Sequence, residues 1–521
     1  MDKAYQHLHR SHYGDTSINH LSNGKQGRLH FNFALETKPG KIKKGRRSLD
    51  DPFRILLLAD LRGRAQSSIE NEADLYSRPC LRMDGDEFDT ILMKYAPYID
   101  LPIGRINFRE LDDFHPDQLY NNLEIFKFLR ETREKLKDPN TFPEVAQQLR
   151  VEQDIPPSSE PGTAAVEPEM DVFDRLLGKS SKQSQHPRSD PPFNALSAMI
   201  REIVAPHILP AADPHLDQYI AAVDMAIAEQ MRAILHDREF QNLEATWRGI
   251  WDLVTSLELD DNLELFLLDV GRKELFQDLK VHSDNLAASA LYHQFIDKAD
   301  GPPNGRFWSV IVGLYDFGYN EQDIELLTGL GYLAAHAGAA FLGGAAPSLI
   351  CCNAFSQCLE PSEWASDLSQ FNELRKSPVA SRIGLTAPRV LMRLPYGKKS
   401  DEIESFDFEE LSKDPDHENF LWGNSALACA KLLGMAFNRK GWAFKLEDCL
   451  NLEDLPAYPI HNEYGSELIP CAEVFMSERV SEEFFRRGII ALMSYRNRNA
   501  VRIQHFQSIA DPPASLAGPW Q

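Results

Sequence analysis

One proline-rich stretch, residues 151–192, divides this chain of 521 residues and constrains its fold more than any other feature. Seven prolines stand there among Ser, Glu, Gln and Gly, a composition that buries too little apolar surface to order itself. A chain of this length also exceeds what one hydrophobic core usually organises. The sequence therefore predicts two domains joined by a disordered linker over residues 140–192, after a flexible polar tail at residues 1–27.

One apolar island, residues 172–177, interrupts this linker. Two interpretations stay open. The island either makes a residual contact with a folded domain, or it is a short linear motif that folds into a helix on a partner. In the second case Phe173, Leu176 and Leu177 form the partner-binding face, because positions i, i+3 and i+4 of a helix lie side by side.

Composition and charge exclude several classes of protein. The chain is 43% apolar and 26% charged, and its net charge of −23 argues against nucleic acid or an anionic membrane as the main partner, since both are polyanions. No apolar run reaches the ~20 residues that span a bilayer, and the first 27 residues contain no apolar signal-peptide core. We expect a globular, cytoplasmic protein without membrane insertion.

Segments with strand character alternate with segments with helix character on both sides of the linker. Apolar or alternating patterns predict strands at residues 53–58, 104–108, 263–267 and 308–314, of which residues 263–267 are typical of a half-buried strand. Helical periodicity predicts helices at residues 117–137, 213–234 and 323–340. The alternation indicates an α/β or α+β architecture of mixed sheets with packed helices.

A glycine cluster carries the only enzymatic interpretation. Residues 328–334 match a GxGxxA dinucleotide pattern, but a true fingerprint places its first glycine directly after a strand. Gly329 and Gly331 fall inside a helical run, so close helix packing is the favoured role. The alternative is an α/β ligand- or nucleotide-binding enzyme domain that uses Gly329, Gly331 and Gly343. Because no GxxxxGK[ST], HExxH, GxSxG or CxxC motif occurs, we expect no catalytic, cofactor-binding or metal site.

The segment EFQNLEATWRGI at residues 239–250 is unusually rich in Trp, Glu and Arg for a core helix. Glu244, Trp247 and Arg248 stand at positions i, i+3 and i+4 and therefore share one helical face. Glu244 can pair with Arg248 beside the Trp247 ring. The resulting rigid patch is either a helix contact within one domain or an interface between subunits.

A second unusual segment, APRVLMRLPYG, occupies residues 387–397. Arg389 and Arg393 stand close to prolines, Pro388 among them, and their spacing in an extended segment puts both side chains on one side. They allow the same two interpretations, intradomain contact or interface. The segment LWGN at residues 421–424, which contains Trp422, follows further along the chain.

Residues 107–117 contain the run DDFHPD, with Asp113, Phe114 and Pro116. This run resembles the hallmark of the small subunit of the type VI secretion contractile sheath. The segments described in the two preceding paragraphs resemble, in the same order, signatures of the large subunit of that sheath. The resemblance implies a fusion: a small-subunit-like domain at residues 28–139, a large-subunit-like domain at residues 193–510 and a tail at residues 511–521.

The resemblance also implies a function. The chain would be a non-enzymatic structural protomer or an accessory subunit of a bacterial contractile sheath, which assembles around an inner tube and contracts to drive effector delivery. Its partners would be other sheath subunits in a homo- or hetero-oligomer, an Hcp-like inner-tube protein, a ClpV-like AAA+ ATPase and the baseplate. The large subunit of the family carries a further C-terminal module that interlocks sheath units, and this sequence shows no counterpart. Main sheath and accessory roles both stay open.

Overall fold

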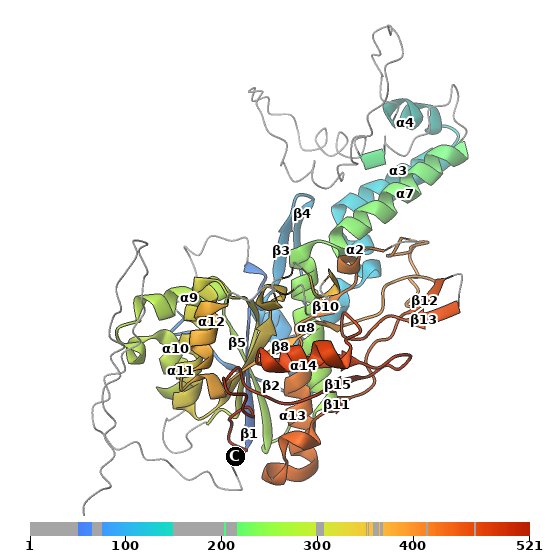
Figure 1. Cartoon of the computed structure of the whole chain (residues 1–521). Coiled ribbons are helices and arrows are strands. Elements are labelled where there is room, and N and C mark those ends of the chain that lie inside the picture. The colour runs from blue at the N-terminus through green and yellow to red at the C-terminus, as the bar shows by residue number, and fades with distance from the viewer. Residues whose placement is uncertain are drawn as a thin grey trace, which may run out of the picture.

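The computed structural model describes residues 51–64, 75–149, 203–204, 216–297, 307–350, 352, 354–357, 364, 368–412, 415–462 and 465–520 (Figure 1). The predicted tail at residues 1–27, the linker from residue 150 to residue 192 and the apolar island lie outside the described residues. Among the helices that are described, none combines the length and the apolar character needed to cross a bilayer.

A nine-stranded mixed sheet forms the centre of the molecule, with the strand order β11-β15-β14-β8-β7-β6-β1-β5-β2. Its parallel strands are β1 (Phe53–Ala59), β5 (Leu263–Asp269), β6 (Val310–Phe317), β7 (Ala340–Ala345), β8 (Ile383–Ala387) and β14 (Ile489–Ser494). The antiparallel strands are β2 (Leu81–Met83), β11 (Asn451–Leu452) and β15 (Val501–Ile503). The α/β class predicted from the sequence is confirmed.

The strand of the first predicted domain lies in the middle of this sheet. Leu57 of β1 pairs in register with Leu267 of β5 on one edge and with Val312 of β6 on the other. A central parallel strand reads as a continuous apolar run because both of its faces are covered. The two parts of the chain therefore share one sheet and the hydrophobic cores on both of its faces.

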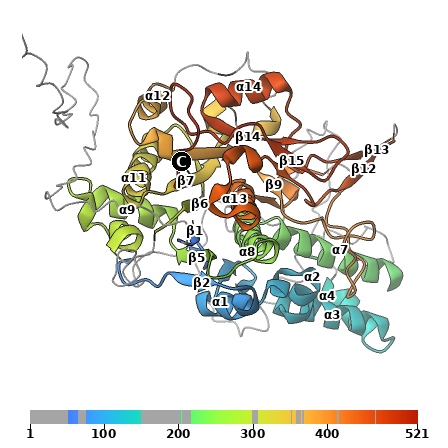
Figure 2. The same cartoon turned by 90° about the horizontal axis from the view of Figure 1, so that it is seen from below.

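Helices cover both faces of the sheet, as Figure 2 shows. Leu57 and Ile55 of β1 pack toward α8 and α13, whereas Leu56 and Leu58 pack toward the opposite layer. The first layer contains α8 (Arg238–Ser256) and α13 (Ala426–Lys440), and the second contains α9 (Arg272–Val281), α10 (Ala290–Tyr292), α11 (Glu321–Ala337), α12 (Ser369–Arg375) and α14 (Glu478–Arg486).

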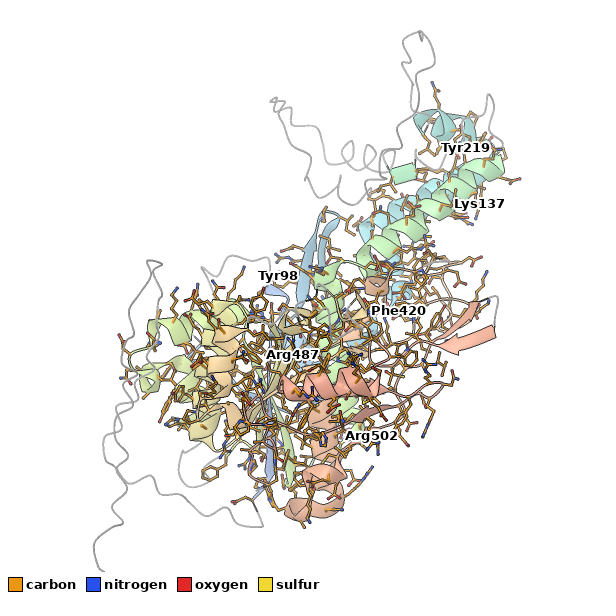
Figure 3. All side chains as sticks on the ribbon, viewed as in Figure 1. Tyr98, Lys137, Tyr219, Phe420, Arg487 and Arg502 are labelled. Carbon is orange, nitrogen blue, oxygen red and sulfur yellow. The ribbon has the colours of Figure 1, made fainter. Side chains whose placement is uncertain are left out.

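An arm of helices extends from the body (Figure 1). It consists of α2 (Pro116–Asn122), α3 (Glu124–Lys137), α4 (Phe142–Leu149) and α7 (Leu216–Leu235). Lys137 at the end of α3 and Tyr219 near the start of α7 lie together toward the tip, far from Arg487 and Arg502 in the body (Figure 3). An ion pair at 2.6 Å between Arg133 Nε and an Asp224 oxygen joins α3 to α7.

The described residues also contain short two-stranded sheets, one further α-helix and several 3-10 helices. The sheets are β3 (Tyr98–Leu101) with β4 (Gly104–Asn107), β9 (Val390–Leu391) with β10 (Trp422–Gly423), and β12 (Pro459–Asn462) with β13 (Gly465–Leu468), and the α-helix is α1 (Phe88–Tyr95). The strand expected at residues 104–108 is β4, which pairs with β3.

Several boundaries differ from the sequence-based expectation. The single helix expected over residues 117–137 is broken at Leu123, whose backbone is extended after two asparagines of low helix propensity. Arg130 donates to the Asn121 carbonyl at this break and so satisfies part of the end of α2. The helix expected to reach residue 340 ends at Ala337, because Gly338 takes a left-handed conformation with φ of +67°.

Strand β5 is buried on both faces, so the half-buried pattern predicted there is wrong. The alternation arose from Glu264, which forms an ion pair with Arg54 on the neighbouring β1. A cross-strand pair of opposite charges allows a carboxylate in an otherwise apolar strand.

Two stretches that the sequence assigns to linker and tail are folded. Helix α4 lies within the predicted linker, and its Phe142 ring packs 5.8 Å from the Tyr219 ring of α7. In the predicted tail, Leu516 is buried and the Trp520 ring stacks 6.4 Å from Phe53 of β1. The apolar side chains of both stretches pack against the protein core. Amino-acid composition alone does not reveal such contacts.

Candidate functional site

The two large-subunit signatures meet in a buried charge network, which we define as Glu244, Arg248, Arg393 and Glu410. Glu244 lies on α8 with 0% of its surface exposed and accepts a hydrogen bond from Arg248 Nε at 2.7 Å. It also accepts one from Arg393 Nε at 2.8 Å. Arg393 in turn donates to both oxygens of Glu410, at 2.7 and 3.0 Å. Opposite charges thus alternate through the core.

Further hydrogen bonds complete this buried charge network. The Tyr396 amide donates to Glu410 at 2.7 Å, and Arg248 donates to the Tyr396 hydroxyl at 2.9 Å. Burial alone would raise the pKa of Glu410, but the Arg393 charge and the hydrogen bonds outweigh it and hold that pKa at about 2. Buried charges are tolerated when they are paired and hydrogen-bonded in this way.

Trp247, which the sequence places beside the Glu244–Arg248 pair, is fully buried. Its indole N–H donates to the Leu61 carbonyl oxygen at 3.1 Å. Its ring lies 5.8 Å from the Phe88 ring and 6.0 Å from the Tyr95 ring. All three partners come from the first part of the chain, so Trp247 sits at the joint between the two parts.

The small-subunit-like run lies at the same joint. Phe114 stacks 4.0 Å from Phe108 and lies 5.7 Å from the Phe240 ring of α8. Asp113 accepts the Arg109 amide at 2.6 Å and closes the turn that leads into α2. Pro116 is the first residue of α2, as its position in the sequence predicts.

The same run also contacts the second signature segment directly. The His115 ring packs 4.9 Å from the Tyr396 ring. Asp117 accepts amide hydrogen bonds from Glu404 at 3.2 Å and from Ser405 at 2.9 Å. The run DDFHPD therefore packs against the loop that carries Tyr396 and Arg393 of the buried charge network.

Arg389 belongs to a separate ion-pair cluster. Its guanidinium donates to Glu473 and to Glu418, the latter at 2.8 and 3.1 Å. His417 lies 3.1 Å from Glu473, and the Trp422 indole donates to the His417 carbonyl at 2.9 Å. Arg389 and Arg393, expected on one side of an extended segment, therefore engage different carboxylates.

His417, Glu418 and Glu473 bring potential metal-ligand atoms within 4.8 Å of one another. The guanidinium of Arg389 already binds both carboxylates, and together with His417 it lowers the pKa of Glu473 to about 2 against the effect of burial. The cluster is thus satisfied by protein charges. Pro388, next to Arg389, follows a cis peptide bond.

A cavity of about 630 Å³ opens at the carboxyl ends of β1, β5 and β6. Residues of the signature segments line it: Asn242 and Thr246 from α8, together with Arg389 and Asn424. Asp316 of β6 faces the same cavity. The cavity and the two ion-pair clusters thus lie where the distinctive segments converge.

The glycine cluster lies elsewhere and lines no part of this cavity. A Cβ added at Gly329 or Gly331 of α11 would come within 2.8 Å of Leu279 or within 2.7 Å of Ile383. A Cβ at Gly343 would come within 2.7 Å of a ring atom of Phe317 on the neighbouring strand. These glycines permit close packing of α11 and β7, and the structure lends no support to the alternative in which they form a ligand pocket.

Sequence reasoning identified Glu244, Trp247, Arg248 and Arg393 but missed Glu410. The signal available for Glu410 was the acidic pair at residues 409–410, which lies between the segments at residues 387–397 and 421–424. Phe173, Leu176 and Leu177 lie outside the described residues.

Comparisons with known proteins agree with this arrangement of two parts in one fold. The family model VipA, described as type VI secretion system, VipA, VC_A0107 or Hcp2, matches residues 22–152. The Pseudomonas aeruginosa type VI secretion system sheath protein TssC1 is 29% identical over 307 residues, which are 57% of this chain and 62% of that protein. This chain therefore matches less than two thirds of its relative. The family model VipB, described as EvpB/VC_A0108, tail sheath N-terminal domain, matches residues 217–510, and the chain belongs to this tail-sheath family.

Proposed function

We propose that this chain is a structural subunit of a type VI secretion contractile sheath, in which small and large subunits form one polypeptide. The position of β1 between β5 and β6 carries the proposal. A region that matches the small-subunit model supplies the central strand of the sheet built by a region that matches the large-subunit model. One chain thus combines a small-subunit-like part and a large-subunit-like part in a single sheet.

The chemistry of the described residues favours scaffolding over catalysis. The buried charge network has its hydrogen bonds satisfied within the fold, and burial raises the pKa of the Cys429 thiol, which disfavours a reactive thiolate. The side chains at the joint between the two parts pack and pair with each other. A protomer held this firmly can keep its fold while its contacts with neighbours rearrange.

The partners and location follow from the same proposal. The chain would work in the bacterial cytoplasm with other copies of itself or related sheath subunits, an Hcp-like inner-tube protein, the baseplate and a ClpV-like ATPase. Its predicted domains, residues 28–139 and 193–510, act as one protomer here. Both a main-sheath role and an accessory role fit this proposal.

Electron microscopy of negatively stained samples tests the proposal. The full chain is purified alone and after co-expression with an Hcp-like inner-tube protein, and the inner-tube protein alone serves as the control. Tubular or ring-shaped assemblies that contain the chain support a sheath role. Short rings or caps that require a second sheath protein favour the accessory role. A chain that stays monomeric at micromolar concentration under all these conditions contradicts both.

A further inference from the structure

The cavity at the carboxyl ends of the parallel strands lies at a topological switch point. Strands β1 and β6 are neighbours, but the next parallel strand of the sheet after β1 is β5 on one side, whereas the next after β6 is β7 on the other. The connections that leave the two strands diverge and open a crevice, where open α/β sheets bind their ligands. The volume of about 630 Å³ falls within the usual range for a small-molecule site.

Asp316 presents an unpaired carboxylate to this cavity. Within the described residues, its one side-chain hydrogen bond comes from Asn424 Nδ2 at 3.1 Å, and no ion pair reaches it. Arg272, the nearest cation on α9, donates instead to the Asp316 backbone carbonyl and to Asp323. Desolvation by the surrounding protein atoms raises the pKa of the Asp316 carboxyl and outweighs the opposing effect of the Arg389 and Arg272 charges, neither of which forms an ion pair with it.

Lys273 supplies an unpaired charge of the opposite sign. It stands in the first turn of α9, lines the same cavity and is exposed. No hydrogen bond or ion pair engages its ammonium group in the part of the chain that the structure describes. The other basic groups at the cavity differ: Arg64, for example, pairs with Asp269 at 2.8 Å.

We propose that this cavity binds a small molecule that carries both a cationic and an anionic group. A guanidinium or ammonium group would pair with Asp316, and a carboxylate would pair with Lys273. Asn242 and Thr246 of α8 offer additional polar atoms on the cavity wall. Free basic amino acids belong to this chemical class. The site is independent of the proposed sheath function, because it is complete within one chain.

Isothermal titration calorimetry of the full chain tests the site with three probes: L-arginine, agmatine and acetate. Agmatine keeps the guanidinium of L-arginine but lacks its carboxylate, and acetate carries the carboxylate alone. We expect saturable binding of L-arginine, binding of agmatine that is about tenfold weaker, and no measurable binding of acetate, because one charged contact contributes about a factor of ten.

Two variants assign the contacts. Asp316→Asn keeps the shape of the side chain and removes its charge, so it should weaken both L-arginine and agmatine about tenfold or more. Lys273→Gln, at an exposed position, should weaken L-arginine about tenfold and leave agmatine unchanged. Glu482→Gln, at an exposed position of α14 away from the cavity, is the matched control and should change neither. Circular dichroism checks that all variants fold.

Three results would overturn the proposal. They are the absence of saturable heat with every probe, L-arginine binding that Asp316→Asn leaves unchanged, or binding that Glu482→Gln weakens as much as Lys273→Gln does. The first excludes a site for this ligand class. The other two place any observed binding outside the cavity. Assembly of the chain into a sheath has no bearing on these measurements.

Discussion

The indole N–H of Trp247 donates a hydrogen bond to the backbone carbonyl of Leu61 at 3.1 Å, and this bond joins the two parts of the chain that separate family models match. Leu61 follows the end of β1, and Trp247 lies in the middle of α8. The contact therefore fixes α8 of the large-subunit part against the end of β1 of the small-subunit part, inside the hydrophobic core.

Trp247→Ala should lower the free energy of unfolding by ~3 to 5 kcal/mol, because it removes a fully buried indole and leaves the Leu61 carbonyl without its donor. Trp251→Ala is the matched control, since that indole lies one turn further along α8 and is 40% exposed. Urea denaturation followed by circular dichroism measures both. Equal losses in the two variants would contradict a special role for Trp247.

The buried charge network should make the free energy of unfolding depend on pH in the acidic range. The folded protein holds the pKa of Glu410 at about 2, below its ordinary value of 4.5. A carboxyl whose pKa is lowered by folding stabilises the protein above its unfolded pKa, and this contribution is lost as pH falls from about 4.5 toward 2. The free energy of unfolding should therefore decrease over that window.

Glu410→Gln tests this assignment. At pH 7 it leaves Arg393 with only Glu244 as a carboxylate partner and should cost ~3 to 5 kcal/mol, and the difference from the natural chain should shrink toward pH 2. Glu453→Gln, whose exposed partner is Arg498, is the control and should change little at any pH. Denaturant titrations at several pH values measure this. A pH-independent cost of Glu410→Gln would refute the linkage.

The sequence predicted four of the described strands, β1, β4, β5 and β6, but not how they pair. Residues 53–58 read as a buried strand from their apolar run, yet nothing local indicates that β5 and β6 flank them. Strand pairing over such separations depends on tertiary packing of the whole sheet. The side chains of α4 and of Trp520 likewise show their role only when the core surface they cover is known.

Within the candidate site, the sequence predicted contacts that follow helical spacing. Glu244 and Arg248 stand four residues apart on α8, so their pairing could be expected. Arg393 and Glu410 join the buried charge network from loops, where no fixed spacing predicts which residues meet. Helical or strand spacing does not single out Asp316, because the role proposed for it depends on the cavity that it faces.

The two parts of the chain should be mutually dependent for folding. Without β1, a fragment of residues 193–521 would leave the edges of β5 and β6 unpaired in the centre of its sheet. We expect this fragment to be insoluble or largely unfolded alone, and to fold when co-expressed with residues 22–152. Co-purification and size-exclusion chromatography measure the association.

A strand-disrupting control makes this fragment test specific. Leu57→Asp in the first fragment places a charge in the centre of the sheet and should abolish the rescue. Arg105→Ala, on the exposed surface of β4, should leave it intact. If residues 193–521 form a stable, folded monomer alone, the dependence does not exist.

The last prediction concerns the apolar island at residues 172–177, which lies outside the described residues. If the island is a recognition motif for a ClpV-like ATPase, Phe173 and Leu177 anchor it at positions i and i+4 of a helix formed on binding. A peptide of residues 165–185 should then bind the N-terminal domain of such an ATPase, and Phe173→Asp with Leu177→Asp should abolish that binding by placing charges in an apolar groove. Asp174→Asn, between the anchors, serves as the control and should bind like the unmodified peptide. Titration calorimetry decides the matter, since equal affinity of the doubly substituted and unmodified peptides would return this segment to the role of a plain connection.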